Sequence, residues 1–163
     1  MADTRLSWEK YALGLAEAAS LRSEDPFVKV GACALNRDHM VLGVGYNGLA
    51  SGKDVDWELF SRDQRRPVML HAEMNCLSLC TKGQVGILAI TLLPCSHCAT
   101  MIAGYGVPTV VYRDDYKLDE GAKEIFKFYN IDLLQITEED TEEFSLGETR
   151  SVILEDNNDI RVG

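Results

Sequence analysis

The sequence predicts an α/β protein, a single three-layer α/β/α domain built around a mixed five-stranded sheet. An apolar stripe at helical spacing is followed by two β-like segments with a short polar turn between them, which favours an antiparallel hairpin. Helical and β-like segments then alternate as far as residue 136, as in folds whose parallel strands are joined by helices. At 163 residues, without an internal repeat or linker, the chain has the size of one ordinary domain.

The first helix is expected over residues 7–23. Ser7 is a suitable N-cap, and apolar side chains recur after it at helical spacing. The dipeptide Asp25-Pro26 ends the helix, because the residue before a proline avoids the helical conformation.

The hairpin is expected from residues 28–36 and 41–47, joined by the turn 37–40. A long irregular connection follows at 48–69, and long loops inside a compact domain are often functional. The remaining expected elements are a helix at 71–80, a strand at 86–93, a short helix that begins near Ser96, a strand at 109–112, a helix at 120–130 and a strand at 131–136.

The charge of the chain argues against nucleic acid as a partner. The net charge is −10 and the pI about 4.7, whereas nucleic-acid-binding proteins usually carry a basic surface. Residues 138–163 hold nine acidic side chains against two arginines. We therefore expect residues 1–137 to form the domain that carries the chemistry, and residues 138–163 to be a partly ordered acidic extension with a short strand at 151–154.

The composition favours a cytoplasmic protein, or one that acts in the host cytoplasm if its source is a virus. No apolar run approaches the ~20 residues of a membrane helix, and the first ten residues lack the hydrophobic region of a signal peptide. Five cysteines, an odd number, favour a reducing compartment with some of the thiols on a metal. We expect no membrane partner.

A zinc site is indicated by three residues in two short motifs. His71 opens the motif "HAE", and Cys95 and Cys98 form a Cys-x-x-Cys pair at the start of a predicted helix. Zinc prefers nitrogen and sulfur ligands, and catalytic zinc sites typically use three protein ligands and leave the fourth position to water. A helix N-terminus favours thiolate over thiol, which suits the two cysteines to this role.

Glu73 is the candidate catalytic residue. It follows His71 by two positions, so that in the first turn of a helix it reaches the same pocket without being a ligand. A carboxylate beside a metal-activated water is suited to take its proton and pass it on. The alternative is a fully structural zinc site, which would normally use a fourth protein ligand. We place His97, between the two cysteines, at the rim of the pocket instead.

The combined pattern, "HAE" and then "PCSHC", is the signature of zinc nucleobase deaminases. The sequence resembles the cytidine deaminase superfamily, and within it the deoxycytidylate (dCMP) deaminases. The segments "SLRSEDPFVKVGACALN", "GVGYNG" and "RDDYK" carry the resemblance beyond the zinc motif. Together these segments cover roughly residues 7–135. The resemblance implies a cytidine-deaminase-like fold and hydrolysis of dCMP to dUMP and ammonia, which supplies thymidylate synthesis.

The resemblance also implies roles for single residues. Asn47 would contact the sugar or hold the nucleotide, and the backbone N–H of Ala72 would bind the base carbonyl. Arg22 and Ser23 match the segment that meets the 5′-phosphate, and Tyr116 would close over it. Each has a plainer alternative: a turn residue for Asn47, a helix-end cation for Arg22, a helix-end hydroxyl for Ser23 and packing for Tyr116.

A second candidate anion site comes from the residues themselves. Arg62, Arg65 and Arg66 form the densest basic run of this acidic chain, just before the zinc motif. A phosphate needs such a local concentration of cations. The run is either a site for the substrate or an effector, or a solvated face of the loop.

Members of the resembled family are commonly homo-oligomers, often hexamers. They are activated by dCTP and inhibited by dTTP, and both effectors bind together with Mg²⁺. A nucleotide substrate, a homohexamer and these effectors are therefore expected, although the loop after "GYNG" departs from the family pattern. The open alternatives are a deaminase of dCTP or of both nucleotides, a tRNA adenosine deaminase, which the pI disfavours, and a structural zinc-binding module without turnover.

Overall fold

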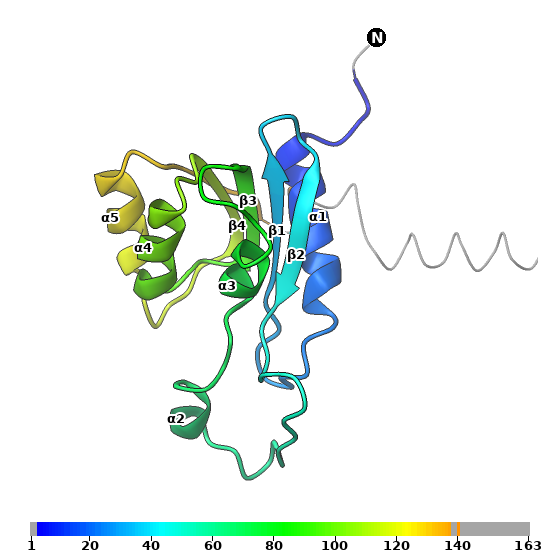
Figure 1. The fold of residues 1–163 in the computed structure, drawn as a ribbon, viewed down its shortest axis with the longest axis vertical. Coiled ribbons are helices and arrows are strands. Elements are labelled where there is room, and N and C mark those ends of the chain that lie inside the picture. The colour runs from blue at the N-terminus through cyan, green and yellow to red at the C-terminus, as the bar shows by residue number, and fades with distance from the viewer. Residues whose placement is uncertain (1–2, 138–139, 141–163) are drawn as a thin grey trace, which may run out of the picture.

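A five-stranded sheet forms the centre of the computed structural model, which describes residues 3–137 and 140, and helices cover both of its faces (Figure 1). The strand order is β2-β1-β3-β4-β5. The strands are β1 (Gly31–Asn36), β2 (Val41–Tyr46), β3 (Val85–Leu92), β4 (Thr109–Asp114) and β5 (Asp132–Gln135). The helices are α1 (Trp8–Ser20), α2 (Arg62–Arg65), α3 (Ala72–Leu77), α4 (Ser96–Gly104) and α5 (Gly121–Phe128). The predicted three-layer α/β fold is confirmed.

The two faces of the sheet bury different helices because side chains of a strand alternate between its faces. On β3, Leu88 and Ile90 belong to a core shared with α3, α4 and α5, whereas Ile87 and Ala89 pack in a second core with α1. Burying a side chain of this size stabilises the fold by about 1.5–3 kcal/mol relative to leaving it exposed. Figure 1 shows α1 on one side of the sheet and α3, α4 and α5 on the opposite side.

The strand directions place the ends of several elements together. β1 pairs antiparallel with both β2 and β3, and β3, β4 and β5 are parallel, as the alternation of helices and strands predicted. In such sheets ligands bind outside the carboxyl ends of the parallel strands. The segment after β3 at this edge leads into α4, which carries the Cys-x-x-Cys motif.

Three predicted boundaries differ from the structure by three residues. The first helix ends at Ser20 rather than at 23, although Ser7 caps it as expected, since its side chain accepts a hydrogen bond from the Lys10 N–H. The segment 28–30 is not a strand, because the side chain of Asn47 bonds its backbone in place of a neighbouring strand. The helix expected at 71–80 keeps α-helical geometry only to Leu77 and continues in tighter turns with bonds three residues apart.

The connection at 48–69 contains a single turn of helix, α2, that the sequence pattern did not predict. Ser61 and Gln64 form a capping box at its start, with the Ser61 side chain accepting from the Gln64 N–H and the Gln64 side chain accepting from the Ser61 N–H. Apart from Asp140, the acidic extension, with its expected strand at 151–154, lies outside the described residues. Within the part of the chain that the structure describes, no helix has the length and apolar composition needed to cross a membrane.

Candidate active site

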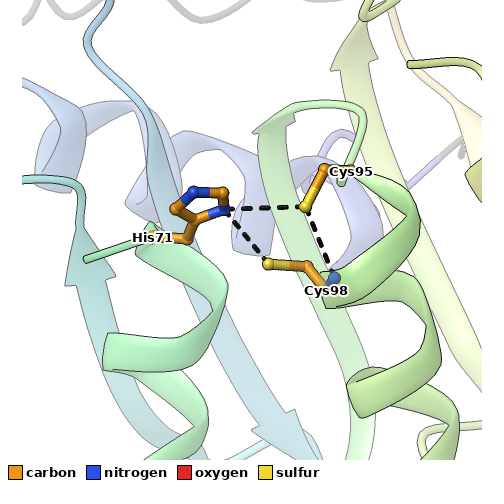
Figure 2. Close-up of side chains that lie close together, drawn as sticks. All are labelled: His71, Cys95 and Cys98. Atoms are coloured by element: carbon orange, nitrogen blue, oxygen red, sulfur yellow. Dashed lines mark hydrogen bonds between the residues drawn. The ribbon is translucent and has the colours of Figure 1, made fainter. Parts of the chain in front are cut away.

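Two helix N-termini bring the three predicted zinc ligands together (Figure 2). His71 is the N-cap of α3, and Cys95 is the N-cap of α4, where its Sγ accepts a hydrogen bond from the Cys98 N–H. Cys98 follows in the first turn of α4 and is buried. Backbone N–H groups and the helix dipole favour negative charge at such positions, so thiolate sulfurs are stabilised there.

The distances between the three donor atoms fit a tetrahedral zinc ion. His71 Nδ1 lies 3.2 Å from Cys98 Sγ and 3.7 Å from Cys95 Sγ. A zinc ion at normal bond lengths separates a bound nitrogen and sulfur by about 3.6 Å. All three ligand atoms lie within 4.8 Å of one another, and one nitrogen with two sulfurs is a donor set that zinc prefers. The predicted proximity of the three residues is confirmed.

The three side chains shift one another's pKa values. The hydrogen bond from Cys98 lowers the pKa of the Cys95 thiol, and the contact with His71 adds to this effect. The same interaction raises the pKa of the Cys98 thiol, because a second thiolate beside the first is unfavourable without a cation. The hydrogen bond with Cys95 raises the pKa of His71. A divalent cation would remove this conflict by neutralising both sulfurs.

Glu73 is a buried carboxyl group beside these ligands, with 4% of its surface exposed. Burial raises the pKa of Glu73 to about 7, against the opposing effects of its own backbone N–H and of His71. Both protonation states are therefore accessible near neutral pH. A group with this property can accept a proton in one step and donate it in the next.

A cavity of about 510 Å³ connects this centre to the arginine run. Its walls include His71, Ala72, Glu73 and Cys95 as well as Arg62, Arg65 and Arg66. Apolar side chains complete the lining, among them Val28, Val30, Met69 and Leu92. The volume lies within the range of small-molecule sites, and a largely apolar wall with a few charged groups is typical of them.

Asn47 lines the cavity, but its side-chain amide is hydrogen-bonded to the protein backbone. Its Nδ2 donates to the Val28 carbonyl and its Oδ1 accepts from the Val30 N–H, each at 2.8 Å. Ser23 supports this arrangement, because its Oγ donates to the Asn47 carbonyl at 2.8 Å. Asn47 therefore fixes the segment 28–30 that forms one wall of the cavity.

The structure separates the predicted phosphate contacts into two groups. Tyr116 and the three arginines line the cavity. Arg22 is exposed and Ser23 is buried, and neither contributes to the cavity wall. This arrangement gives no support to a phosphate contact by Arg22 or Ser23.

Two carboxylates on the cavity wall, Asp25 and Asp119, were missed as site residues by the sequence analysis. Asp25 precedes a proline and was interpreted only as the end of a helix. Asp119 lies between Tyr116 and the next helix, in a position where a helix-capping residue is common. Both pair with residues 23 or more positions away, which no local pattern reveals. His97 lies at the cavity, as expected.

Comparison with known proteins agrees with this chemistry. A family model described as the cytidine and deoxycytidylate deaminase zinc-binding region matches residues 6–114. A deoxycytidylate deaminase from Mus musculus is 29% identical over 147 residues, which cover 83% of this chain and 83% of that protein. The crystal structure of dCMP deaminase from the cyanophage S-TIM5 in apo form is 26% identical, with a TM-score of 0.64 over 78% of this chain and 96% of that one. A crystal structure of the same phage protein in complex with dCMP and dUMP has a TM-score of 0.60 at 26% identity, over 79% and 93% of the two chains.

Proposed function

The chain belongs to the cytidine and deoxycytidylate deaminase family, and from this premise we propose that it deaminates dCMP to dUMP with release of ammonia. One observation carries the proposal: a buried glutamate lines a cavity together with three arginines and with His71 and Cys95, two of the three residues that could hold zinc. The first two features fit hydrolysis of an aminopyrimidine, and the arginines fit a phosphorylated one. The mouse relative is named for dCMP deamination, and the cyanophage protein has been crystallised with dCMP and dUMP.

His71, Cys95 and Cys98 would hold the zinc ion. When bound there, zinc supplies a nucleophile at neutral pH by lowering the pKa of water to about 7. Glu73, two residues beyond His71, lines the same cavity as His71 and Cys95 and is therefore placed to exchange protons with the substrate.

Glu73 moves the protons of the reaction. It accepts a proton from the attacking water as the oxygen bonds to C4, and donates it to N3 of the base. Glu73 then carries the second proton of that water from the hydroxyl on C4 to the amino nitrogen, the C4–N bond breaks and ammonia leaves, so that water and dCMP become dUMP and ammonia. Burial suits Glu73 to both steps, since it brings the pKa of the carboxyl group to about 7.

The remaining site residues orient the substrate. The Ala72 N–H, in the first turn of α3, has no intrahelical acceptor and is available to the base carbonyl. Asn47 holds the wall against which the sugar lies, and Tyr116 with Arg62, Arg65 and Arg66 encloses the phosphate. We assign this machinery to residues 1–137, with the acidic extension 138–163 outside it.

The family resemblance supports three wider proposals. We propose a homohexamer, activation by dCTP and inhibition by dTTP with Mg²⁺. We also place the reaction in the cytoplasm, because Cys95 and Cys98 must stay reduced to bind zinc and all five cysteines are free.

A substrate panel tests the function. Zinc-loaded protein is incubated with dCMP, dCTP, deoxycytidine, CMP and cytosine, each with and without added dCTP or dTTP and Mg²⁺, and ammonia release is measured. Turnover favouring dCMP is the expected result. Turnover of dCTP at a similar rate would support the second candidate function, deamination of both dCMP and dCTP. The three arginines on the cavity wall could bind a triphosphate as well as a monophosphate. No turnover of any cytosine nucleotide would contradict the proposal and favour a zinc-binding module.

A further inference from the structure

We propose that Arg65 is the residue that selects the 5′-phosphate, and that Asp25 positions its guanidinium group for this task. The inference rests on the proposed function, because the phosphate belongs to the proposed substrate. Of the three arginines on the cavity wall, Arg65 alone is partly buried, while Arg62 and Arg66 are exposed.

Two contacts hold the Arg65 guanidinium group. Its Nη1 lies 3.3 Å and 3.4 Å from the two oxygens of Asp25, and the side chains of Arg65 and Asp25 are only 13% and 7% exposed. The central carbon of the group lies over the Phe27 ring, 4.4 Å from its centroid. The ring fixes the plane of the guanidinium group and the carboxylate fixes its rotation within that plane.

Asp25 is itself held rigidly by its own loop. Its Oδ1 accepts hydrogen bonds from the Phe27 and Val28 N–H groups at 2.8 Å and 3.2 Å. The Val28 carbonyl is in turn bonded by the side chain of Asn47. A continuous series of contacts thus runs from the end of β2 through residues 25–28 to Arg65, and α2 supplies Arg65 from the other side of the cavity wall.

These contacts leave one edge of the guanidinium group without a partner. The Arg65 Nε–H is buried and makes no hydrogen bond, and it is the one such side-chain nitrogen or oxygen among the described residues. No hydrogen bond from Nη2 to a described residue is present either. A buried donor without an acceptor is unfavourable, and an acceptor supplied by a ligand would satisfy it.

The free edge has the geometry that a phosphate requires. Nε and Nη2 point in the same direction from the planar guanidinium group, and two oxygens of a phosphate accept from such a pair in parallel. Asp25 occupies the opposite nitrogen, Nη1, at distances longer than the 2.7–2.9 Å of a strong charged hydrogen bond. The pair is therefore loose enough for Arg65 to keep much of its attraction for an anion.

Arg62 and Arg66 add charge without this orientation. Neither has an acidic partner within 4.0 Å in the described part of the chain, and both side chains are solvated. A flexible exposed cation loses side-chain entropy when it binds, whereas Arg65 is already in place. Arg65 is thus expected to distinguish a nucleotide from a nucleoside, and Arg37, which is exposed and does not line the cavity, serves as the control.

The test compares dCMP with deoxycytidine in the zinc-loaded full chain. We expect Arg65→Gln to lower kcat/KM for dCMP on the order of 10²-fold and to leave the value for deoxycytidine within about twofold of wild type. Arg65→Lys should lose nearly as much, because an ammonium group keeps the charge but lacks the two-nitrogen edge. Arg37→Gln, an exposed arginine between β1 and β2 that does not line the cavity, should leave kcat/KM for dCMP unchanged.

Asp25→Asn tests the positioning role. It keeps the shape of the side chain but weakens its hold on Nη1, so we expect KM for dCMP to rise about tenfold with kcat unchanged and deoxycytidine unaffected. Calorimetric binding of dUMP and deoxyuridine, with zinc content measured for every variant, gives a second reading that does not need turnover. Arg65→Gln should weaken dUMP and leave deoxyuridine unchanged.

The outcomes separate this inference from the function on which it rests. Equal losses on dCMP and deoxycytidine, or no loss with Arg65→Gln, would overturn the role of Arg65 while dCMP deamination stands. A wild-type protein that neither turns over dCMP nor binds dUMP would overturn the proposed function and this inference with it.

Discussion

Asp119 binds the first residue of the helix that carries Cys98. Its Oδ2 accepts the Ser96 N–H at 2.7 Å, and its Oδ1 accepts the Ser96 hydroxyl at 2.6 Å. Oδ1 also accepts the Gly121 N–H at 3.1 Å, so that one carboxylate joins the start of α4 to the start of α5. The position of the Cys-x-x-Cys motif therefore depends on a residue that is not a zinc ligand.

Replacing Asp119 with alanine is expected to weaken the zinc site. The Ser96 N–H loses its acceptor and the first turn of α4 loosens, which should cost about 1 kcal/mol of folding free energy and 10- to 100-fold in zinc affinity. Zinc affinity is measured by competition with a chelator and stability by urea unfolding. Asp115→Ala is the control, because Asp115 pairs with Lys123 at the surface, 3.0 Å apart. An equal effect of the two variants on zinc would contradict the prediction.

The contribution of Asp119 to stability should depend on pH. The hydrogen bonds from Ser96 hold the pKa of the Asp119 carboxyl group below its usual value. A depressed pKa contributes stability that is fully present above the unfolded value, about 3.9, and is lost as the pH falls through the folded value. The difference in unfolding free energy between metal-free wild type and metal-free Asp119→Ala should therefore be constant from pH 6 to 5 and shrink below about pH 4. A difference in unfolding free energy that does not change with pH would show that the ionised Asp119 carboxylate is not its source.

The fold and the grouping of the three proposed zinc ligands could be predicted from sequence because their signals are local. The Cys-x-x-Cys and His-x-Glu spacings each fit within one helical turn, and the alternation of helical and β-like segments spans whole elements. Arg65 also stood out as part of a basic run. Its partner Asp25 lies 40 residues earlier in the chain, before β1, β2 and the loop that leads to α2, and no periodicity links the two positions.

The same reasoning applies to the placement of Arg22, which the sequence pattern does not reveal. It sits close to the cavity-lining residue Asp25 in the chain, within the segment that carries the family resemblance. The helix ends at Ser20 and the backbone turns between these positions, so that Ser23 is buried against the Asn47 carbonyl while Arg22 is exposed to solvent. Whether a side chain near a helix end points into the protein or into solvent depends on two or three backbone angles, which composition and spacing do not reveal.

Glu73→Gln is expected to keep the site and remove the proton transfer. The amide has nearly the same shape as the carboxyl group but cannot accept the proton of the attacking water, so kcat for dCMP should fall by about 10²- to 10⁴-fold. Zinc content and dUMP affinity should remain close to wild type. Glu124→Gln, on the exposed side of α5, is the control and should leave kcat unchanged. Full activity of Glu73→Gln would exclude the proposed mechanism.

Removal of zinc should inactivate the protein and lower its melting temperature. Without the cation, Cys95 and Cys98 are a thiolate and a thiol in contact, and the two helix N-termini lose the group that joins them. Dialysis against a chelator followed by stoichiometric Zn²⁺ should restore both properties in wild type. Cys95→Ser should not recover zinc, whereas Cys33→Ser, in the sheet away from the trio, should recover it. Activity that survives complete zinc removal would contradict the assignment.

The glycine at position 45 should control the placement of His71 and Glu73. An added Cβ would lie 2.5 Å from the Ala72 carbonyl oxygen and 2.5 Å from the Cys76 N, both in the backbone of α3. Since backbone cannot move aside as a flexible side chain can, Gly45→Ala must displace α3 from β2, at a cost of about 1–3 kcal/mol. We expect a lower melting temperature together with weaker zinc binding and lower kcat, because α3 begins at the metal ligand.

Gly104 provides the matched control for that substitution. It ends α4, and an added Cβ would meet nothing within 4 Å. Gly104→Ala should therefore leave zinc affinity and kcat unchanged and stabilise the fold by up to about 1 kcal/mol, since alanine loses less conformational entropy in a helix. The prediction is contradicted if Gly45→Ala lowers stability but leaves zinc affinity and kcat at wild-type values. In that case the contact between β2 and α3 stabilises the fold without determining the position of His71.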